Sequence, residues 1–210
     1  MKNAHSDDSG SLEAKLRRRE APDAAALARL RQELAERAAA AGLVDVAFER
    51  HDSPLGPLVL GATAKGLVRV GLPAEAEDDV LGELAERLSP RVLCASRDAV
   101  TQARRELDEY FEGSRRRFEV PLDWQLTRGF RREVLRATAR IPYGRTASYG
   151  EVASRAGSPA AFRAAGSALA TNPLPIFVPC HRVLPASGGI GGYRGGAEAK
   201  ARLLGLEGAA

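Results

Sequence analysis

Two adjacent side chains, Cys180 and His181, are of the types needed for nucleophilic chemistry. A free thiol has a pKa near ~8.5 and is a weak nucleophile at neutral pH unless a base or a positive field favours the thiolate. His181 is the nearest base. Neighbouring side chains need not meet, so a relay through a water molecule is an alternative to direct contact, and a carboxylate such as that of Glu207 must then orient the imidazole. A buried structural cysteine beside a histidine with satisfied hydrogen bonds remains the other interpretation.

A short apolar run between prolines leads to Cys180. It reads Pro-Leu-Pro-Ile-Phe-Val-Pro over residues 173–179 and follows Asn172. Because proline fixes φ and lacks a backbone donor, this run predicts a rigid, extended segment. Such a segment delivers the thiol and the imidazole with little conformational freedom.

Two short helices with a tight turn between them are predicted over residues 148–156 and 160–170, which is typical of a helix-turn-helix. Eight of the eleven residues in the second helix are Ala, Gly or Ser, and its long polar side chain is Arg163. A helix that reads the major groove needs several such side chains. Two interpretations stay open: a smooth helix in a minor groove with Arg163 between bases, or close helix-on-helix packing.

The region before these motifs predicts a small α+β domain. Short β-rich runs between residues 43 and 72 indicate an antiparallel meander, and residues 75–88 and 97–111 have helical spacing. A further strand is expected at residues 91–95. Cys94 lies in this strand, and we predict that it is buried and inert.

The first 42 residues predict an extension. Residues 1–21 are polar and charge-dense without periodicity, which favours a loose tail. Pro22-Asp23 has the pattern of a helix start, and Gly42 provides the stop. We expect the narrow apolar stripe of this helix to pack on the body of the protein; the stripe consists of Leu27, Leu30, Leu34 and Ala38.

The chain therefore divides into three parts: an extension over residues 1–42, an α+β domain over residues 43–122 and a helical domain over residues 123–210. The helical domain opens with a helix that Thr127 can start and that Ile-Pro-Tyr-Gly at 141–144 ends.

The net charge of +4 is unevenly distributed. Residues 121–210 hold twelve Lys and Arg against five Asp and Glu, whereas residues 1–120 hold nineteen against twenty-two. A basic C-terminal part suggests an anionic ligand, of which nucleic acid is the commonest, although a solvated basic face has the same composition.

The cysteine and histidine content limits other chemistry. Two cysteines and three histidines provide neither a disulfide framework nor zinc spacing, so no metal or cofactor is expected. The N-terminus has no apolar signal segment, and no window reaches the ~18 apolar residues of a membrane span. We therefore expect a cytoplasmic protein without membrane contact.

The segment Pro-Cys-His-Arg-Val at 179–183, preceded by Asn172-Pro173, resembles the active-site signature of the 6-O-alkylguanine-DNA alkyltransferases of bacterial type. These are also called methylated-DNA-protein-cysteine methyltransferases. The resemblance covers residues 43–208. Further motifs match in the family's order and spacing: Ser-Pro-Leu-Gly-Pro at 53–57, Gly66-Leu67, Ile-Pro-Tyr-Gly at 141–144, Ser-Tyr-Gly-Glu-Val-Ala at 148–153, Arg-Ala-Ala-Gly at 163–166, the glycine-rich run 188–196 with Tyr193, and Leu203-Leu204 followed by Glu207.

The resemblance implies an α+β fold, in which a ribonuclease H-like domain with a small antiparallel sheet precedes a helical, winged-helix-like domain that contains the helix-turn-helix. It also implies DNA repair by direct reversal. The cysteine that matches Cys180 takes the alkyl group of 6-O-methylguanine, and by extension of 4-O-methylthymine, from a nucleotide flipped through the minor groove of double-stranded DNA. Because the alkyl group stays on the cysteine, each monomer acts once and without a cofactor, as a methylated-DNA-[protein]-cysteine S-methyltransferase.

The matching positions imply a role for each site residue. His181 deprotonates the thiol through a water and is held by Glu207, while Asn172 ties the active-site turn to the helix-turn-helix. Tyr149 helps to rotate the target nucleotide out and assists the departing guanine, and Arg163 fills the space left in the base stack. The DNA-binding set implied is Ser148, Tyr149, Arg163, Ala164 and Arg194, and the pocket set is Pro175, Val183, Gly191, Tyr193 and Arg194.

One departure from the family and two rival functions qualify this resemblance. Arg194 stands where some members have a smaller residue, so we expect a phosphate contact from its side chain. A lesion sensor that flips the base without chemistry is one rival, but such proteins lack the acceptor cysteine. A cysteine hydrolase using Cys180, His181 and Glu207 is the other; it needs an oxyanion hole and leaves the helix-turn-helix unexplained.

Overall fold

The computed structural model describes residues 23–209. Within them, β1 (Val46–His51), β2 (Leu58–Thr63) and β3 (Gly66–Gly71) form the antiparallel meander that the sequence predicts. β4 (Val92–Cys94) pairs in parallel with the other side of β1, and the strand order is β3-β2-β1-β4. The sheet is therefore mixed, because α3 (Glu77–Arg87) carries the chain back before β4 begins.

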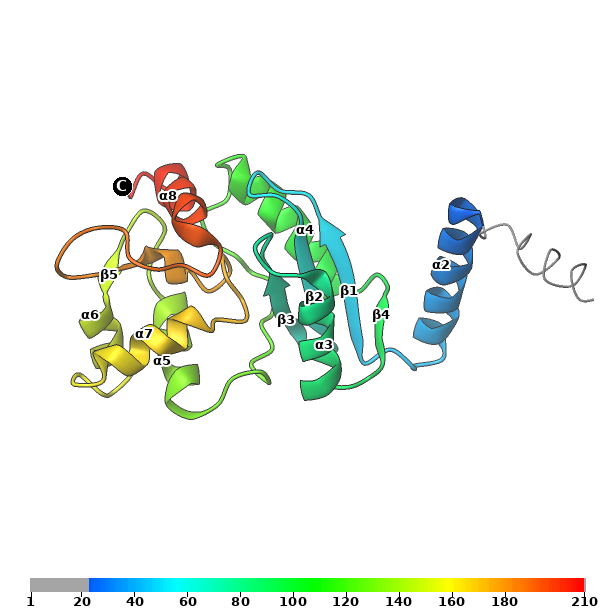
Figure 1. The fold of residues 1–210 in the computed structure, drawn as a ribbon, viewed down its shortest axis with the longest axis horizontal. Helices are drawn as coiled ribbons and strands as arrows, with labels where there is room; N and C mark the ends of the chain where they lie inside the picture. Colours follow the sequence, from blue (N-terminus) through cyan, green and yellow to red (C-terminus); the bar gives the residue numbers. More distant parts are fainter. Residues whose placement is uncertain (1–22, 210) are drawn as a thin grey trace, which may run out of the picture.

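Two helices cover opposite faces of this sheet. Residues that alternate along a strand point to opposite faces, so Leu58 and Leu60 cluster with buried residues of α4 (Asp98–Phe111), whereas Val59 between them clusters with Val80 of α3. Figure 1 shows α3 and α4 on either side of the strands. This domain buries its apolar side chains without help from α2 (Ala24–Ala40).

The connection to the second half runs along the free edge of β3. The backbone N–H of Leu67 donates to Pro121 O at 2.8 Å, and the N–H of Asp123 donates to Leu67 O at 2.7 Å. Gly66 makes this close approach possible, because its φ is +135° and a Cβ there would lie 2.1 Å from Pro121 O. The linker is therefore fixed to the sheet.

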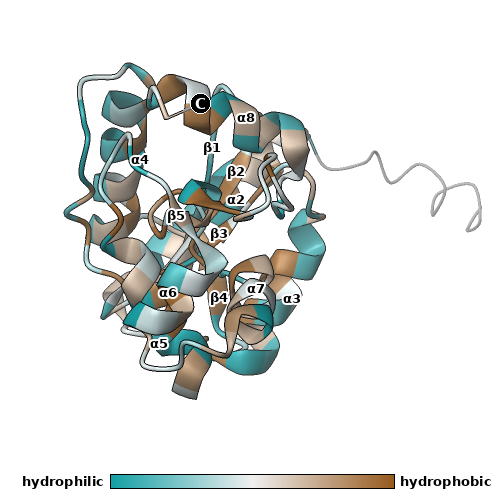
Figure 2. Cartoon of the chain, turned by 90° about the vertical axis from the view of Figure 1, so that its left-hand side faces the viewer, coloured by the Kyte–Doolittle hydropathy of each residue, from teal (hydrophilic) through white to brown (hydrophobic). Residues whose placement is uncertain are grey.

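The second half consists mainly of helices. They are α5 (Gly129–Ala139), α6 (Tyr149–Arg155), α7 (Phe162–Ala170) and α8 (Gly196–Leu206), with a two-stranded parallel pairing of β5 (Ala147–Ser148) and β6 (Val183–Leu184). Ser148 caps α6 and forms a reciprocal capping box with Glu151. One hydrophobic cluster runs from Leu58 in the sheet to Leu203 in α8, so the two halves share a core. In Figure 2, strands coloured as hydrophobic lie at the centre of the fold, and the surrounding helices carry both hydrophilic and hydrophobic residues.

The predicted N-terminal helix is present, but its expected packing was wrong. Asp23 caps α2, with its Oδ1 accepting from Ala25 N at 3.1 Å. Leu30 and Leu34 are each 62% exposed, whereas Ala35 is buried. The turn after α2 directs the alanine side of the helix, and not the leucine stripe, toward the edge of the sheet, where a cavity of about 830 Å³ separates α2 from β1 and β4. The predicted tail, residues 1–21, lies outside the described residues.

The prediction that Cys94 is buried was also wrong, since its side chain is exposed. β4 is a three-residue edge strand with a single neighbour, and Cys94 is its last residue. An edge strand of this length leaves one flank of its final residue open. Among residues 23–209, no helix combines the length and the apolar character required to cross a membrane.

Candidate active site

Cys180 begins a short 3-10 turn (Cys180–Arg182) and is buried, with 6% of its surface exposed. Asn172 holds this turn from the end of α7. Its Nδ2 donates to Val178 O at 2.9 Å and to Cys180 Sγ at 3.2 Å, and its Oδ1 accepts from Leu174 N at 3.0 Å. Asn172 thus connects the helix-turn-helix to the thiol. All three hydrogen bonds of its side-chain amide are made to buried groups of the protein.

The environment of Cys180 keeps its thiol protonated at rest. Burial raises the pKa of Cys180, and the Asn172 hydrogen bond and the Lys200 charge only partly oppose this effect. A protonated thiol is a poor nucleophile, so a base has to accept its proton as it attacks.

His181 is fully buried, and its Nε2 lies 2.9 Å from Glu207 Oε1. Burial lowers the pKa of His181 more than the Glu207 carboxylate raises it, so the imidazole is neutral near pH 7. Because a carboxylate only accepts hydrogen bonds, Nε2 carries the proton and Nδ1 keeps its lone pair. Nδ1 is buried without a hydrogen-bond partner among the described residues, which leaves it free to act as the base.

Glu207 follows α8 directly and is buried, yet it stays ionised. Burial raises its pKa, but hydrogen bonds from His181, Arg182 and Tyr110 outweigh this and bring it down to about 2. Arg182 binds both carboxylate oxygens at 2.8 Å, and the Tyr110 hydroxyl donates to Oε1 at 2.7 Å. Gly144 N adds a fourth donor at 3.3 Å.

Sequence reasoning missed Arg182 and Tyr110 as parts of this site. Arg182 had a signal, since it follows Cys180-His181 directly in the sequence. It is buried, and its guanidinium donates both to the Glu207 carboxylate and to Ile141 O. Tyr110 had none: it belongs to α4 in the first half of the chain and lies 97 residues from its partner.

A cavity of about 180 Å³ opens above Cys180 between α7 and the glycine-rich loop. Tyr193, which the resemblance places in the pocket, lines it together with Tyr149, Gly166, Leu169, Ala170 and Gly192. Burial raises the pKa of Tyr149, so its phenol stays a proton donor. Gly166 of α7 lies next to this tyrosine, since a Cβ there would be in van der Waals contact with the Tyr149 ring at 3.8 Å.

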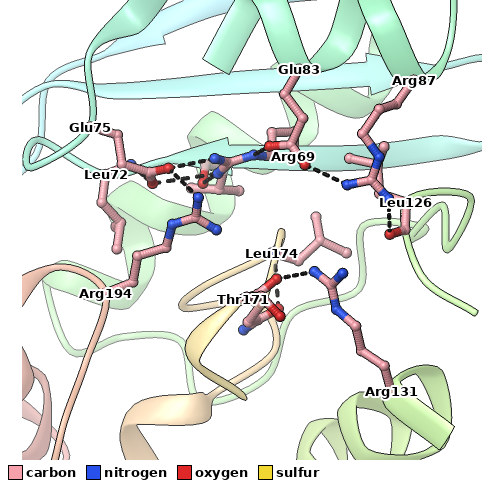
Figure 3. Close-up of polar contacts among 12 residues, drawn as sticks. Arg69, Leu72, Glu75, Glu83, Arg87, Leu126, Arg131, Thr171, Leu174 and Arg194 are labelled. Carbon is pink, nitrogen blue, oxygen red and sulfur yellow. Dashed lines mark hydrogen bonds and ion pairs between the residues drawn. The ribbon is translucent and has the colours of Figure 1, made fainter. Parts of the chain in front are cut away.

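Four other predicted pocket residues are not in the lining of this cavity. Pro175 is buried in the turn before Cys180, and Val183 is buried at the start of β6. Gly191 packs near Pro185 and the Tyr149 hydroxyl. Val183 O accepts from the buried Lys200 Nζ at 2.8 Å, a contact that sequence reasoning missed. The fourth residue, Arg194, lies against Glu75 of the first domain, with Nη2 2.9 Å from Oε1 (Figure 3).

Four of the five predicted DNA-contacting residues lie at α6 and α7, and the fifth, Arg194, lies in the glycine-rich loop. Arg163 and Ala164 are exposed on α7, and the Arg163 guanidinium lies 5.4 Å from the centre of the Phe162 ring. Ser148 is half buried at the start of α6. The same helix α7 therefore presents Arg163 to solvent and Gly166 to the cavity.

Two family models match the chain. The ribonuclease-like domain of 6-O-methylguanine DNA methyltransferase matches residues 46–124, and the DNA binding domain of the same family matches residues 129–209. These matches confirm the predicted α+β class, with a small sheet domain before a helical DNA-binding domain.

Individual relatives agree with these matches. The chain is 39% identical over 148 residues to the inducible methylated-DNA–protein-cysteine methyltransferase of Bacillus subtilis, which covers 70% of this chain and 82% of that protein. It is 41% identical over 157 residues to the corresponding protein of Mycobacterium leprae, covering 74% and 88%. The crystal structure of Mycobacterium tuberculosis OGT in complex with DNA matches with a TM-score of 0.65 and 38% identity, covering 77% of this chain and 92% of that one. The chain therefore belongs to the 6-O-methylguanine DNA methyltransferase family.

Proposed function

We propose that this protein repairs alkylated DNA by moving the alkyl group from the 6-oxygen of guanine to Cys180 Sγ. The observation that carries this proposal is the arrangement at the cavity floor. A buried thiol lies beside a neutral imidazole whose Nε2 is held by an ionised carboxylate and whose Nδ1 has no partner among the described residues. In this arrangement the imidazole can accept the thiol proton as the sulfur attacks.

The first step is activation of the thiol. The Cys180 proton passes to His181 Nδ1 through a water molecule, and Glu207 stabilises the imidazolium that forms. Lys200 and the Asn172 amide favour the thiolate at the same time. The thiolate therefore exists mainly during the reaction, which limits side reactions of the buried sulfur.

The second step is transfer. The sulfur attacks the alkyl carbon, an S–C bond forms, and the C–O bond breaks with its electron pair left on the guanine. The Tyr149 hydroxyl, which stays protonated, donates a hydrogen bond to the base as this charge develops. The product is a thioether, and because a thiolate is a poor leaving group from an unactivated carbon, each molecule acts once.

DNA binding is assigned to the exposed side of α7. Its small residues allow the helix to approach the minor groove closely, and the target nucleotide rotates out of the duplex into the cavity on the other side of the same helix. Arg163 fills the space left in the stack, with Ser148 and Ala164 next to the DNA backbone. We propose 6-O-methylguanine and 4-O-methylthymine in double-stranded DNA as the substrates and a monomer as the active form.

The intact mass of the protein before and after incubation with duplex DNA containing 6-O-methylguanine tests this function. We expect a gain of one methylene per molecule, located on Cys180 by peptide mapping. Cys180→Ser should gain nothing, whereas Cys94→Ser, which changes the exposed cysteine, should gain as much as the unaltered protein. An unchanged mass with tight binding to the lesion would identify a sensor instead.

A further inference from the structure

Glu75 lies where the first domain meets the glycine-rich loop, residues 188–196 (Figure 3). Its Oε1 is 2.5 Å from Arg69 Nη2 and 2.9 Å from Arg194 Nη2, and its Oε2 accepts from Leu72 N at 3.0 Å. Two of these donors belong to the first domain and the third belongs to the loop. The carboxylate therefore joins two segments that are more than a hundred residues apart in the sequence.

Arg69 fixes Glu75 from the side of the sheet. Its side chain projects from β3 and is 2% exposed, and it also binds Glu83 through Nε at 3.0 Å. A guanidinium buried to this degree requires its carboxylate partners, because an unpaired buried charge is strongly unfavourable. The first domain thus holds Glu75 in place without any contribution from Arg194.

The loop needs such an anchor. Gly188, Gly189, Gly191 and Gly196 all have positive φ, and glycine-rich backbone loses more conformational freedom on ordering than other backbone. Arg194 directly follows Tyr193, which is a wall of the cavity over Cys180. The neighbouring Gly195 packs on the first domain as well, since a Cβ there would lie 3.1 Å from Leu72 Cδ1.

We propose that Glu75 is a positioning residue: through its ion pair with Arg194 it fixes the Tyr193 wall of the cavity, so the first domain controls the rate of alkyl transfer. This inference rests on the proposed function of Cys180. It also gives Arg194 a role different from the phosphate contact expected from the sequence, because its charge is already paired and only 31% of its side chain is exposed.

Single-turnover transfer rates for Glu75→Gln, Arg194→Ala and the double variant test this inference. We expect each single variant to be about tenfold slower, since small displacements of a reacting group's surroundings are costly. The double variant should be no slower than either. The losses should be equal on duplex DNA and on free 6-O-methylguanine base, because the loop borders the base and not the backbone. Arg194→Lys should recover part of the rate.

Two controls separate positioning from other effects. Glu77→Gln breaks the exposed Arg50–Glu77 ion pair two residues away and should leave the rate unchanged. Arg194→Ala leaves the buried Arg69–Glu75 pair intact, so it reports on the loop even if Glu75→Gln destabilises the domain. If Arg194 instead contacts phosphate, Arg194→Ala will weaken duplex binding and lower the salt slope by about one, and Glu75→Gln will strengthen binding. That pattern would overturn the inference.

Hydrogen exchange of residues 188–196 in the DNA-free protein gives a result that does not depend on alkyl transfer. Faster exchange in Glu75→Gln and Arg194→Ala than in Glu77→Gln supports the anchor, and equal exchange in all three excludes it. An unaltered protein that transfers no alkyl group would refute the proposed function. Full activity in both Glu75→Gln and Arg194→Ala would refute this inference alone.

Discussion

At the scale of single residues, the chemistry we propose for Cys180 depends on the state of one carboxylate. Glu207 is buried but accepts hydrogen bonds from His181, Arg182 and Tyr110, and its pKa falls to about 2 as a result. An ionised Glu207 fixes the proton of His181 on Nε2. The basic Nδ1 is thereby available on the same ring, and in the mechanism we propose it accepts the thiol proton.

The pH dependence of transfer should reflect a neutral His181. Burial lowers its pKa below the ordinary 6.5, and the neutral ring is the form that takes the thiol proton. The single-turnover rate should therefore stay level as pH falls from about 8 to 6.5 and decrease only below that range. The folded state prefers the neutral ring, so stability linked to His181 is likewise lost as pH falls through and below 6.5.

Rates measured across this pH range, with NMR titration of the histidines, check this prediction. His51→Gln is the control, because His51 is also buried with a lowered pKa but belongs to β1. His51→Gln should change how the free energy of unfolding depends on pH. It should not change how the transfer rate depends on pH. A rate that is already half-lost at pH 6.5 would contradict a neutral His181.

At the scale of elements, close approaches of backbone segments position the two halves. Gly66→Ala places a Cβ 2.1 Å from Pro121 O, with φ at +135°, and must displace the linker from β3. We expect a loss of at least about 3 kcal/mol in the free energy of unfolding. Gly113→Ala, also at positive φ but with no atom within 4 Å, should cost only about 1 kcal/mol. Urea unfolding of both variants measures the difference, and equal losses would show that the linker is not fixed to the sheet.

Helix α7 presents one long basic side chain, Arg163. Removing this side chain should affect base flipping but not the alkyl-transfer step. Arg163→Ala should slow repair of duplex DNA, while transfer from the free alkylated base stays near the unaltered rate. Arg155→Ala, at the exposed end of α6, is a matched loss of charge. Arg155→Ala should weaken duplex binding slightly, but it should not make repair of duplex DNA slower relative to transfer from the free base. Equal losses on both substrates for Arg163→Ala would count against its role in the base stack.

At the scale of the whole molecule, the first domain contributes directly to the site. Tyr110 of α4 reaches Glu207 across the shared core. Tyr110→Phe removes one donor from Oε1, so we expect transfer to slow by a fewfold and stability to fall by about 1 kcal/mol. Tyr143→Phe is the matched control, since the Tyr143 hydroxyl donates to Leu206 O at 2.8 Å and not to the carboxylate. It should cost similar stability and leave the rate unchanged; similar rates for both variants would exclude the coupling.

The N-terminal extension should be dispensable for repair. α2 buries Ala35 but leaves Leu30 and Leu34 exposed, and a large cavity lies between this helix and the sheet. A chain that starts at Leu43 should keep the transfer rate within about twofold, because elements with few buried contacts add little to the stability of the rest. Mass measurement of the shortened protein checks this, and loss of transfer would assign the extension a part in the site.

Local patterns determined most of the elements and the candidate nucleophile. Short β-rich runs between turn residues indicated β1 to β3, and a helix-start signal indicated α2, because these features depend on residues close in sequence. The extended segment expected over residues 173–179 was wrong. The chain turns back there, with Val178 N donating to Leu174 O at 2.8 Å and Ile176 at a φ of +74°. The need for an orienting carboxylate followed from the chemistry, and the family resemblance pointed to Glu207, whose Oε1 lies 2.9 Å from His181 Nε2.

Tertiary structure alone decided which distant groups share these sites. The exposure of Cys94 followed from the edge position of β4, and the exposure of Leu30 and Leu34 followed from the turn after α2. Tyr110 on Glu207 and Arg194 on Glu75 are pairs whose members have no local signal for each other. Long-range pairs depend on how the helices dock on the sheet, so the low pKa of Glu207 and the anchoring of the loop arise only when the two halves fold on a common core.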